Sequence, residues 1–120
     1  MFKKCRYINS TNALAQEYPV NKQRIVHQVV FCLASGTDSP KTDLFLSDGR
    51  RILSSIPGVE NFRVLRQTSA KNDFDFGFSM EFADQNAYGA YNRHPLHTAF
   101  VADRWIPEVS RFLETDFQEL

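Results

Sequence analysis

Apolar positions alternate from residue 24 to residue 34, which predicts a first β-strand. Apolar side chains occupy most of both faces, with Ile25, His27, Val29, Phe31 and Leu33 on one and Val26, Gln28, Val30 and Cys32 on the other. A strand that is apolar on two sides is covered on two sides. In a chain of 120 residues, we expect helices to cover one face and a partner subunit to cover the other.

The remaining pattern predicts a helix over residues 41–55, a turn at 56–59 and a second strand over 61–68. A third strand over 74–82 alternates almost perfectly, with Phe74, Phe76, Phe78, Met80 and Phe82 on one face. Asp84 is expected to cap a helix that runs to about residue 92. A further helix is expected from residue 95 to near 105, with Pro107 closing it, before a final strand over 110–118.

The predicted order, β-α-β-β-α(α)-β, is typical of an α+β fold. It indicates a ferredoxin-like antiparallel sheet with helices on one face. The opposite face would expose Val26, Val30 and Leu65. Since a large bare apolar patch is unusual on a monomer, we expect a homodimer formed face to face through the open sheet.

Length and charge allow one domain, over residues 24–120, with an N-terminal arm at 1–23. Fourteen basic and fourteen acidic residues cancel, which argues against binding to nucleic acid or to an anionic membrane. No apolar run follows the basic N-terminus or is long enough to span a membrane. Cys5 and Cys32 follow no metal or redox spacing. We therefore expect a cytoplasmic protein.

The candidate chemistry lies in residues 91–97, which are expected to join two helices. Pro95 suits the first turn of the second helix, and His97 would follow in that turn, where the helix dipole disfavours a protonated imidazole. A neutral imidazole beside the phenol of Tyr91 can act as an acid–base pair. Both side chains can equally be structural, and His94 can cap the helix. His94 and His97 have no further ligand at a supporting spacing, so we expect no metal.

Several segments resemble the stress-responsive α/β-barrel (Dabb) domain family, over about residues 25–119. They are Val26-His27-Gln28-Val29-Val30-Phe31, Ile56-Pro57-Gly58-Val59, Met80-Glu81-Phe82-Ala83-Asp84, Ala90-Tyr91, His94-Pro95-Leu96-His97 and Phe100-Val101. The resemblance implies a dimeric α/β barrel of the ferredoxin-like type.

One plant member of the family is a polyketide cyclase, and the resemblance carries its catalytic histidine to His97 and its assisting tyrosine to Tyr91. A pocket histidine matches His27, whereas another corresponds to Phe76 and is missing here. We expect a pocket between sheet and helices lined by His27, Phe76, Tyr91 and His97. Phe78 is a further candidate for its wall, and His94 a further candidate for ligand binding.

Three functions remain open at this point. The first is binding of a small apolar carbonyl or aromatic compound, with His/Tyr acid–base chemistry and no cofactor. The second is a stable dimeric stress protein without catalysis. The third is a cofactor-free monooxygenase acting on an activated aromatic substrate.

Overall fold

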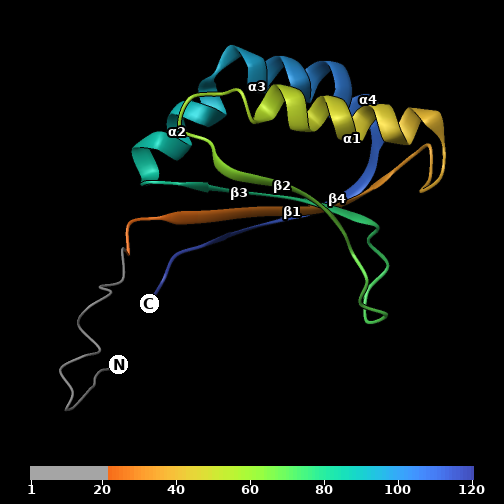
Figure 1. The fold of residues 1–120 in the computed structure, drawn as a ribbon, viewed down its shortest axis with the longest axis horizontal. Helices are drawn as coiled ribbons and strands as arrows, with labels where there is room; N and C mark the ends of the chain where they lie inside the picture. The colour runs from red at the N-terminus through yellow and green to blue at the C-terminus, as the bar shows by residue number, and fades with distance from the viewer. Residues whose placement is uncertain (1–21) are drawn as a thin grey trace.

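The computed structural model describes residues 22–120, so all but the last two residues of the expected arm lie outside the described residues. Its elements, in chain order, are β1 (Ile25–Leu33), α1 (Pro40–Leu53), β2 (Glu60–Arg66), β3 (Phe76–Phe82), α2 (Gln85–Arg93), α3 (Pro95–Phe100), a π-helical turn η2 (Val101–Trp105), α4 (Ile106–Glu108) and β4 (Val109–Phe117). Figure 1 shows the helices gathered on one side of the sheet and the other side bare. The predicted α+β, ferredoxin-like fold is confirmed.

The four strands are antiparallel to their neighbours, in the order β2-β3-β1-β4. β1 therefore lies at the centre, and β4 forms one edge. The register places Phe78 opposite Val29, and Met80 opposite His27. Because side chains alternate along a strand, these residues share the face that the helices cover. The apolar stripe of the third strand is thus the floor of the core.

Aromatic rings fill most of the space between this floor and helix α1. Phe31, Phe45 and Phe78 are almost completely buried, and the rings of Phe45 and Phe78 are nearly parallel, with centroids 6.2 Å apart. Gly49 of α1 lies directly over Phe78, where an added Cβ would come within 2.6 Å of the ring. Glycine weakens a helix interior, but here it lets α1 approach the sheet closely.

The start of α2 has the predicted cap, and the start of α1 is capped as well. The Asp84 carboxylate accepts a hydrogen bond from the Ala87 N–H at 2.9 Å at the start of α2. Ser39 accepts one from the Thr42 N–H at 3.2 Å, and Pro40 takes the first position of α1. Each cap satisfies a backbone N–H that has no partner within its helix.

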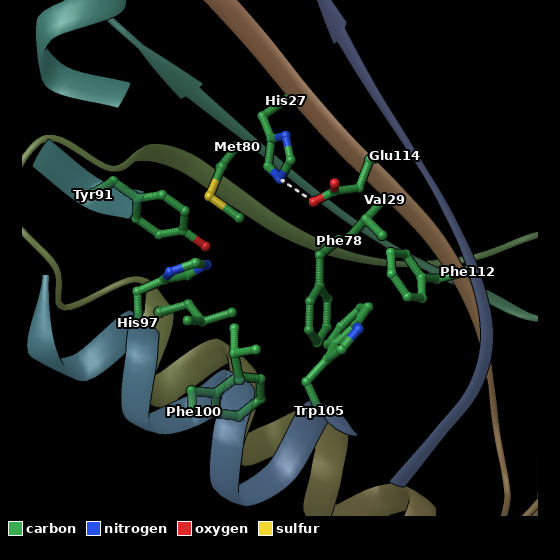
Figure 2. Close-up of a pocket in the computed structure, with 12 residues that line it drawn as sticks. His27, Val29, Phe78, Met80, Tyr91, His97, Phe100, Trp105, Phe112 and Glu114 are labelled. Atoms are coloured by element: carbon green, nitrogen blue, oxygen red, sulfur yellow. Dashed lines mark ion pairs between the residues drawn. The ribbon is translucent and has the colours of Figure 1, made fainter. Parts of the chain in front are cut away.

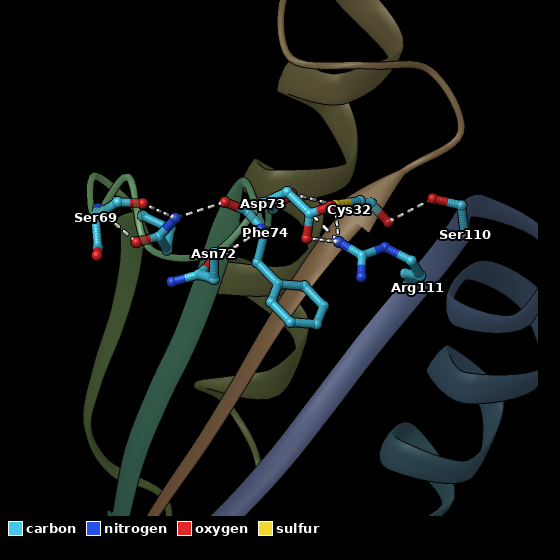
Figure 3. A network of polar contacts seen from close by, with 8 residues as sticks. Cys32, Ser69, Asn72, Asp73, Phe74, Ser110 and Arg111 are labelled. Atoms are coloured by element: carbon cyan, nitrogen blue, oxygen red, sulfur yellow. Dashed lines mark hydrogen bonds and ion pairs between the residues drawn. The ribbon is translucent and has the colours of Figure 1, made fainter.

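The third strand begins at Phe76, and the prediction that it begins at Phe74 is wrong. The Phe74 N–H donates to the Asn72 side chain instead of joining a neighbouring strand. Its ring lies under the Arg111 guanidinium, 4.3 Å from ring centroid to Cζ, and Asp73 pairs with the same arginine (Figure 3). Local side-chain bonds therefore hold this segment as a turn on the open side of the sheet.

The helix predicted from residue 95 is continuous but not uniform. After Phe100 it widens into η2, and the Ile106 N–H donates to the Val101 carbonyl five residues earlier. Pro107 lies inside the final turn, α4, instead of closing the helix before it. Proline has no N–H to donate and crowds the preceding turn, and a single π turn is a known adjustment inside a helix. The wider turn places both Val101 and Trp105 over the sheet.

The open face of the sheet carries the apolar residues predicted for it. Val26 and Val30 are half-buried within the single chain, and Leu65 is exposed. The register adds two exposed residues of β4, because Leu113 lies opposite Val30, and Phe117 opposite Val26. These five residues form the open apolar face.

Substitution of Gly49 by alanine is expected to destabilise the protein by about 1–3 kcal/mol, because the new methyl group overlaps the packed Phe78 ring. Gly89→Ala in α2 is the matched control. There the nearest atom is the mobile end of Arg93 at 3.1 Å, so the gain in helix propensity, up to ~1 kcal/mol, should dominate. Urea unfolding of the two variants measures both effects; equal effects of the same sign would contradict the packing argument.

Candidate functional site

A cavity of about 270 Å³ lies between the covered face of the sheet and the helices (Figure 2). It begins where the aromatic layer under α1 ends. Most of its wall is apolar, and a few polar groups enter it from opposite sides. The lining residues are His27, Val29, Leu53, Phe78, Met80, Tyr91, His97, Phe100, Val101, Trp105, Phe112 and Glu114. A concave, mostly apolar surface with few polar groups is typical of a small-molecule site.

The seam between α2 and α3 places His97 and Tyr91 in this cavity. His94 ends α2 and caps α3, accepting a hydrogen bond from the Leu96 N–H at 3.1 Å. One turn later, His97 Nδ1 lies 3.1 Å from the Asn92 carbonyl oxygen. A carbonyl only accepts, so Nδ1 carries the hydrogen and Nε2 keeps its lone pair. His97 therefore offers a proton acceptor to the cavity.

The Tyr91 hydroxyl is a buried polar group at the edge of the cavity. The side chain is 2 % exposed, and its ring packs on His97 with centroids 4.5 Å apart. Within residues 22–120, no hydrogen bond reaches its oxygen, which points into the cavity beside the His97 ring (Figure 2). A buried hydroxyl without a partner is costly. A ligand atom that accepts its hydrogen would remove that cost.

Burial controls the protonation of this pair. It lowers the pKa of His97, and the nearby His27 acts in the same direction, against the opposing effects of the Asn92 carbonyl and Glu114. Burial also raises the pKa of Tyr91 far above its usual value. At neutral pH, His97 is therefore an uncharged base and Tyr91 a hydrogen-bond donor.

His27 faces the pair from the sheet and is held by a carboxylate. Its Nδ1 lies 2.6 Å from an Asp116 oxygen, and the Tyr88 hydroxyl donates to the same carboxylate at 3.0 Å. Since Asp116 can only accept, Nδ1 carries the hydrogen and Nε2 is directed to the cavity side. There Nε2 lies 4.0 Å from the nearer Glu114 oxygen. Both cavity histidines thus present Nε2.

The structure brings four of the six predicted site residues together: His27, Phe78, Tyr91 and His97 line the cavity. Phe76, which was expected in the wall, and His94, which was a further candidate for ligand binding, do not line it. Phe76 is buried against Phe31, one pair further along the sheet. The His94 ring is engaged in capping α3.

Sequence reasoning missed Asp116, Tyr88 and Glu114. Glu114 and Asp116 lie opposite Val29 and His27, on the covered face of the sheet. The available signal was the presence of two acidic residues on the same strand face as Phe112. Nothing in the sequence pairs Tyr88 with Asp116, because that contact depends on the packing of α2 over β4.

Within residues 22–120, no three His, Cys, Asp or Glu side chains are grouped so that they could hold a metal ion. In the same part of the chain, no helix is long and apolar enough to cross a membrane.

Comparison with known proteins agrees with this architecture. The chain is similar to a Dabb family protein of ferredoxin-like fold from Mesorhizobium loti, with 55% identity, a TM-score of 0.81, and coverage of 82% of this chain and 98% of that one. A dimeric ferredoxin-like protein of unknown function from Thermobifida fusca has 18% identity, a TM-score of 0.68, and coverage of 84% and 95%. A hydroxynitrile lyase from Passiflora edulis has 12% identity, a TM-score of 0.71, and coverage of 82% and 95%. The last two likenesses show the fold alone.

No functionally curated protein is significantly similar to the chain in sequence. The sequence model of the family described as "Stress responsive A/B Barrel Domain" matches residues 25–119, which is nearly all of the described chain. Together with the fold, the 55% identical relative confirms the resemblance inferred from the sequence motifs. The chain is a member of the stress-responsive A/B barrel (Dabb) domain family.

Proposed function

We propose that this protein binds a small, mostly apolar carbonyl compound in the cavity and that His97 and Tyr91 transfer a proton next to its carbonyl group. The observation that carries the proposal is the buried Tyr91 hydroxyl, which has no hydrogen-bond partner within residues 22–120 and lies beside the free Nε2 of His97. A carbonyl oxygen is the acceptor that this hydroxyl lacks.

The step is a simple enolisation. Nε2 of His97 takes a proton from the carbon next to the carbonyl, and the C–H electron pair becomes the C=C bond of an enolate. The carbonyl π electrons move to the oxygen, where the Tyr91 O–H stabilises the negative charge. Return of the proton from His97 reverses the step. The lowered pKa of His97 and the raised pKa of Tyr91 keep both groups in the forms that this step needs.

The walls support an apolar or aromatic body for the ligand. Phe78, Phe100 and Trp105 lie at the end of the cavity away from Tyr91 (Figure 2). A flat ring could pack against them while its carbonyl reaches the polar end. The Passiflora lyase supports the idea that this fold can carry an enzyme, but fold alone does not specify a reaction.

We further infer that the protein is a homodimer that buries the open apolar face. Val30 and Leu65 both approach Gly77, so that the apolar surface is continuous from β1 to β2. Several charged groups beside it are already paired within the chain, Arg24 with Glu60 and Glu81, and Arg111 with Asp73. Arg63, opposite Ser79, is exposed on this face, so a second copy has to leave Arg63 in solvent or pair it across the interface. Relatives described as dimeric support this inference.

The catalytic role is tested with phenylacetone, a small apolar ketone whose methylene protons exchange slowly in D₂O. NMR should show faster exchange in the presence of the protein. His97→Gln should reduce that acceleration by at least about a hundredfold, and Tyr91→Phe by about a hundredfold. His94→Asn, which removes an imidazole outside the cavity and keeps a capping residue, should exchange at the normal rate.

Binding is measured separately by the emission of Trp105, the chain's single tryptophan and a wall of the cavity. Binding of phenylacetone without faster exchange would refute the catalytic role and show that the protein only binds the ketone. Absence of both binding and exchange would refute the proposed function.

The pH dependence of stability should reflect the lowered pKa of His97. The unfolded chain takes up a proton near the ordinary histidine pKa of about 6.5, whereas the folded chain resists protonation of His97 until a lower pH. Unfolded molecules then bind more protons, so stability should fall as pH drops below about 6.5. Urea unfolding between pH 7.5 and 5.5 should show a smaller loss for His97→Gln than for the unaltered protein; equal losses would contradict the shift.

Dimerisation is tested by Leu65→Glu, which places a charge on the open apolar face at an already exposed position. Sedimentation velocity at micromolar concentration should change from dimer to monomer while circular dichroism stays the same. Leu44→Glu, an equally drastic change on exposed Leu44 of α1, should leave a dimer. A monomeric unaltered protein, or dissociation by both variants, would exclude this interface.

A further inference from the structure

The charges around the cavity are unbalanced. Among its lining residues, Glu114 carries the only carboxylate, and none is a lysine or an arginine. Asp116, just beyond the wall, is occupied by His27 and Tyr88. Glu114 has no such engagement: its nearest ionisable partner is His27 Nε2 at 4.0 Å, and its side chain is 59% exposed. A ligand entering the cavity therefore meets a negative charge on β4.

No nearby guanidinium offsets this charge. Arg104, on the helix above the cavity, is paired with Asp48 at 2.7 Å and with Glu108 at 2.6 Å. Arg111 of β4 lies on the opposite face of the sheet, where it pairs with Asp73 (Figure 3). The two arginines closest in sequence to the cavity walls are thus engaged by acids of their own.

The influence of Glu114 extends across the site. It contributes to raising the pKa of both Tyr88 and Tyr91, and it favours the protonated form of His97 on the far side of the cavity. The groups that face this carboxylate are His27 and Asp116 from the sheet, and Tyr88, Tyr91 and His97 from the helices. At neutral pH none of the helix groups carries a positive charge that would cancel it.

The aromatic walls act in the same direction as Glu114. The faces of Phe78, Phe100, Trp105 and Phe112 carry partial negative charge, which repels anions and attracts cations. Phe112 and Glu114 lie on the same face of β4, two residues apart, so a ligand passing this strand contacts both (Figure 2).

We propose that Glu114 makes the cavity select its ligands by charge, admitting uncharged and cationic compounds and excluding carboxylates and phosphates of the same size. This inference rests on the proposed function, in that it assumes that the cavity binds small carbonyl compounds. It narrows the class of ligand to neutral ketones, aldehydes and amides, and to carbonyl compounds whose apolar body also carries an amine. Glu114 would then be a specificity residue that takes no part in proton transfer.

The test uses probes of nearly identical shape. Phenylacetamide is neutral, phenylacetate is its negatively charged counterpart, and phenethylamine is positively charged at pH 8. Titration followed by Trp105 emission, with calorimetry as a second measurement, gives the three dissociation constants. We expect phenylacetate to bind at least about tenfold more weakly than phenylacetamide, as one carboxylate several ångströms away at a protein surface would cause.

Glu114→Gln keeps the shape of the side chain and removes its charge. In this variant phenylacetate should bind within about threefold of phenylacetamide, and phenethylamine should weaken, while phenylacetamide stays unchanged. Glu119→Gln makes the same change of charge outside the cavity and should leave all three constants as they were. Because Glu114 is exposed to solvent, added salt should reduce the difference in affinity between phenylacetamide and phenylacetate in the unaltered protein.

The outcomes separate this inference from the proposed function. Failure of phenylacetamide and phenylacetone to bind would refute the proposed function and with it the inference. Binding of phenylacetamide and phenylacetate with equal affinity would refute charge selection alone. A gap that persists in Glu114→Gln would also overturn the role of Glu114 and assign the selection to the aromatic walls.

Discussion

The packing of helix α1 onto the phenylalanines of β1 and β3 determines where the rest of the molecule lies. Gly49 lets the helix backbone approach Phe78, and Phe45 then stacks over the same ring. Along the sheet, this aromatic layer gives way to His27 and Met80, which lie opposite each other. The cavity begins at that boundary. It is a continuation of the core in which aromatic filling is replaced by a few polar groups, so that shape and chemistry of the site follow from one packing arrangement.

The two cavity histidines come from opposite layers and are oriented by the same device. Each has its Nδ1 hydrogen held by an oxygen, from the Asn92 carbonyl for His97 and from the Asp116 carboxylate for His27. The bonds fix the rings and the tautomers and leave both Nε2 atoms available. The two histidines differ in their charge environment, because the Asn92 carbonyl is neutral whereas the Asp116 carboxylate is charged. That difference makes the two imidazoles chemically distinct although they face the same space.

Local patterns along the chain predict its elements well and its contacts less well. Alternation located the strands, and Pro95 after His94 located the seam between two helices, because both signals depend only on neighbouring residues. The start of β3 at Phe76 depended on the neighbouring Asn72 and also on Arg111, which lies in β4, far along the chain. The same holds for the predicted site residues. The seam between the helices placed Tyr91 and His97 in the cavity, but the sequence could not show that Phe78 lines the cavity and Phe76 does not.

The chemical reasoning from sequence was right in direction for His97 and incomplete in cause. A lowered pKa was expected from the start of a helix, whereas burial is the main contribution. Asp116 and Glu114 were not found because their importance depends on the pairing of β4 with β1, and the order of strands in a sheet is not a local property. The expected cytoplasmic location stays a prediction.

The position of β4 at the edge of the sheet has a consequence for dynamics. This strand supplies Asp116, Glu114 and Phe112, yet it is bonded to the sheet on one side only, through β1. Edge strands open locally more easily than central ones, without unfolding of the whole domain. Fraying of β4 would release the partner of His27, the charge at the cavity wall and one aromatic wall together. The integrity of the site is therefore governed by the local opening of one strand, and amide hydrogen exchange along β4 would report on it more closely than would the global stability of the fold.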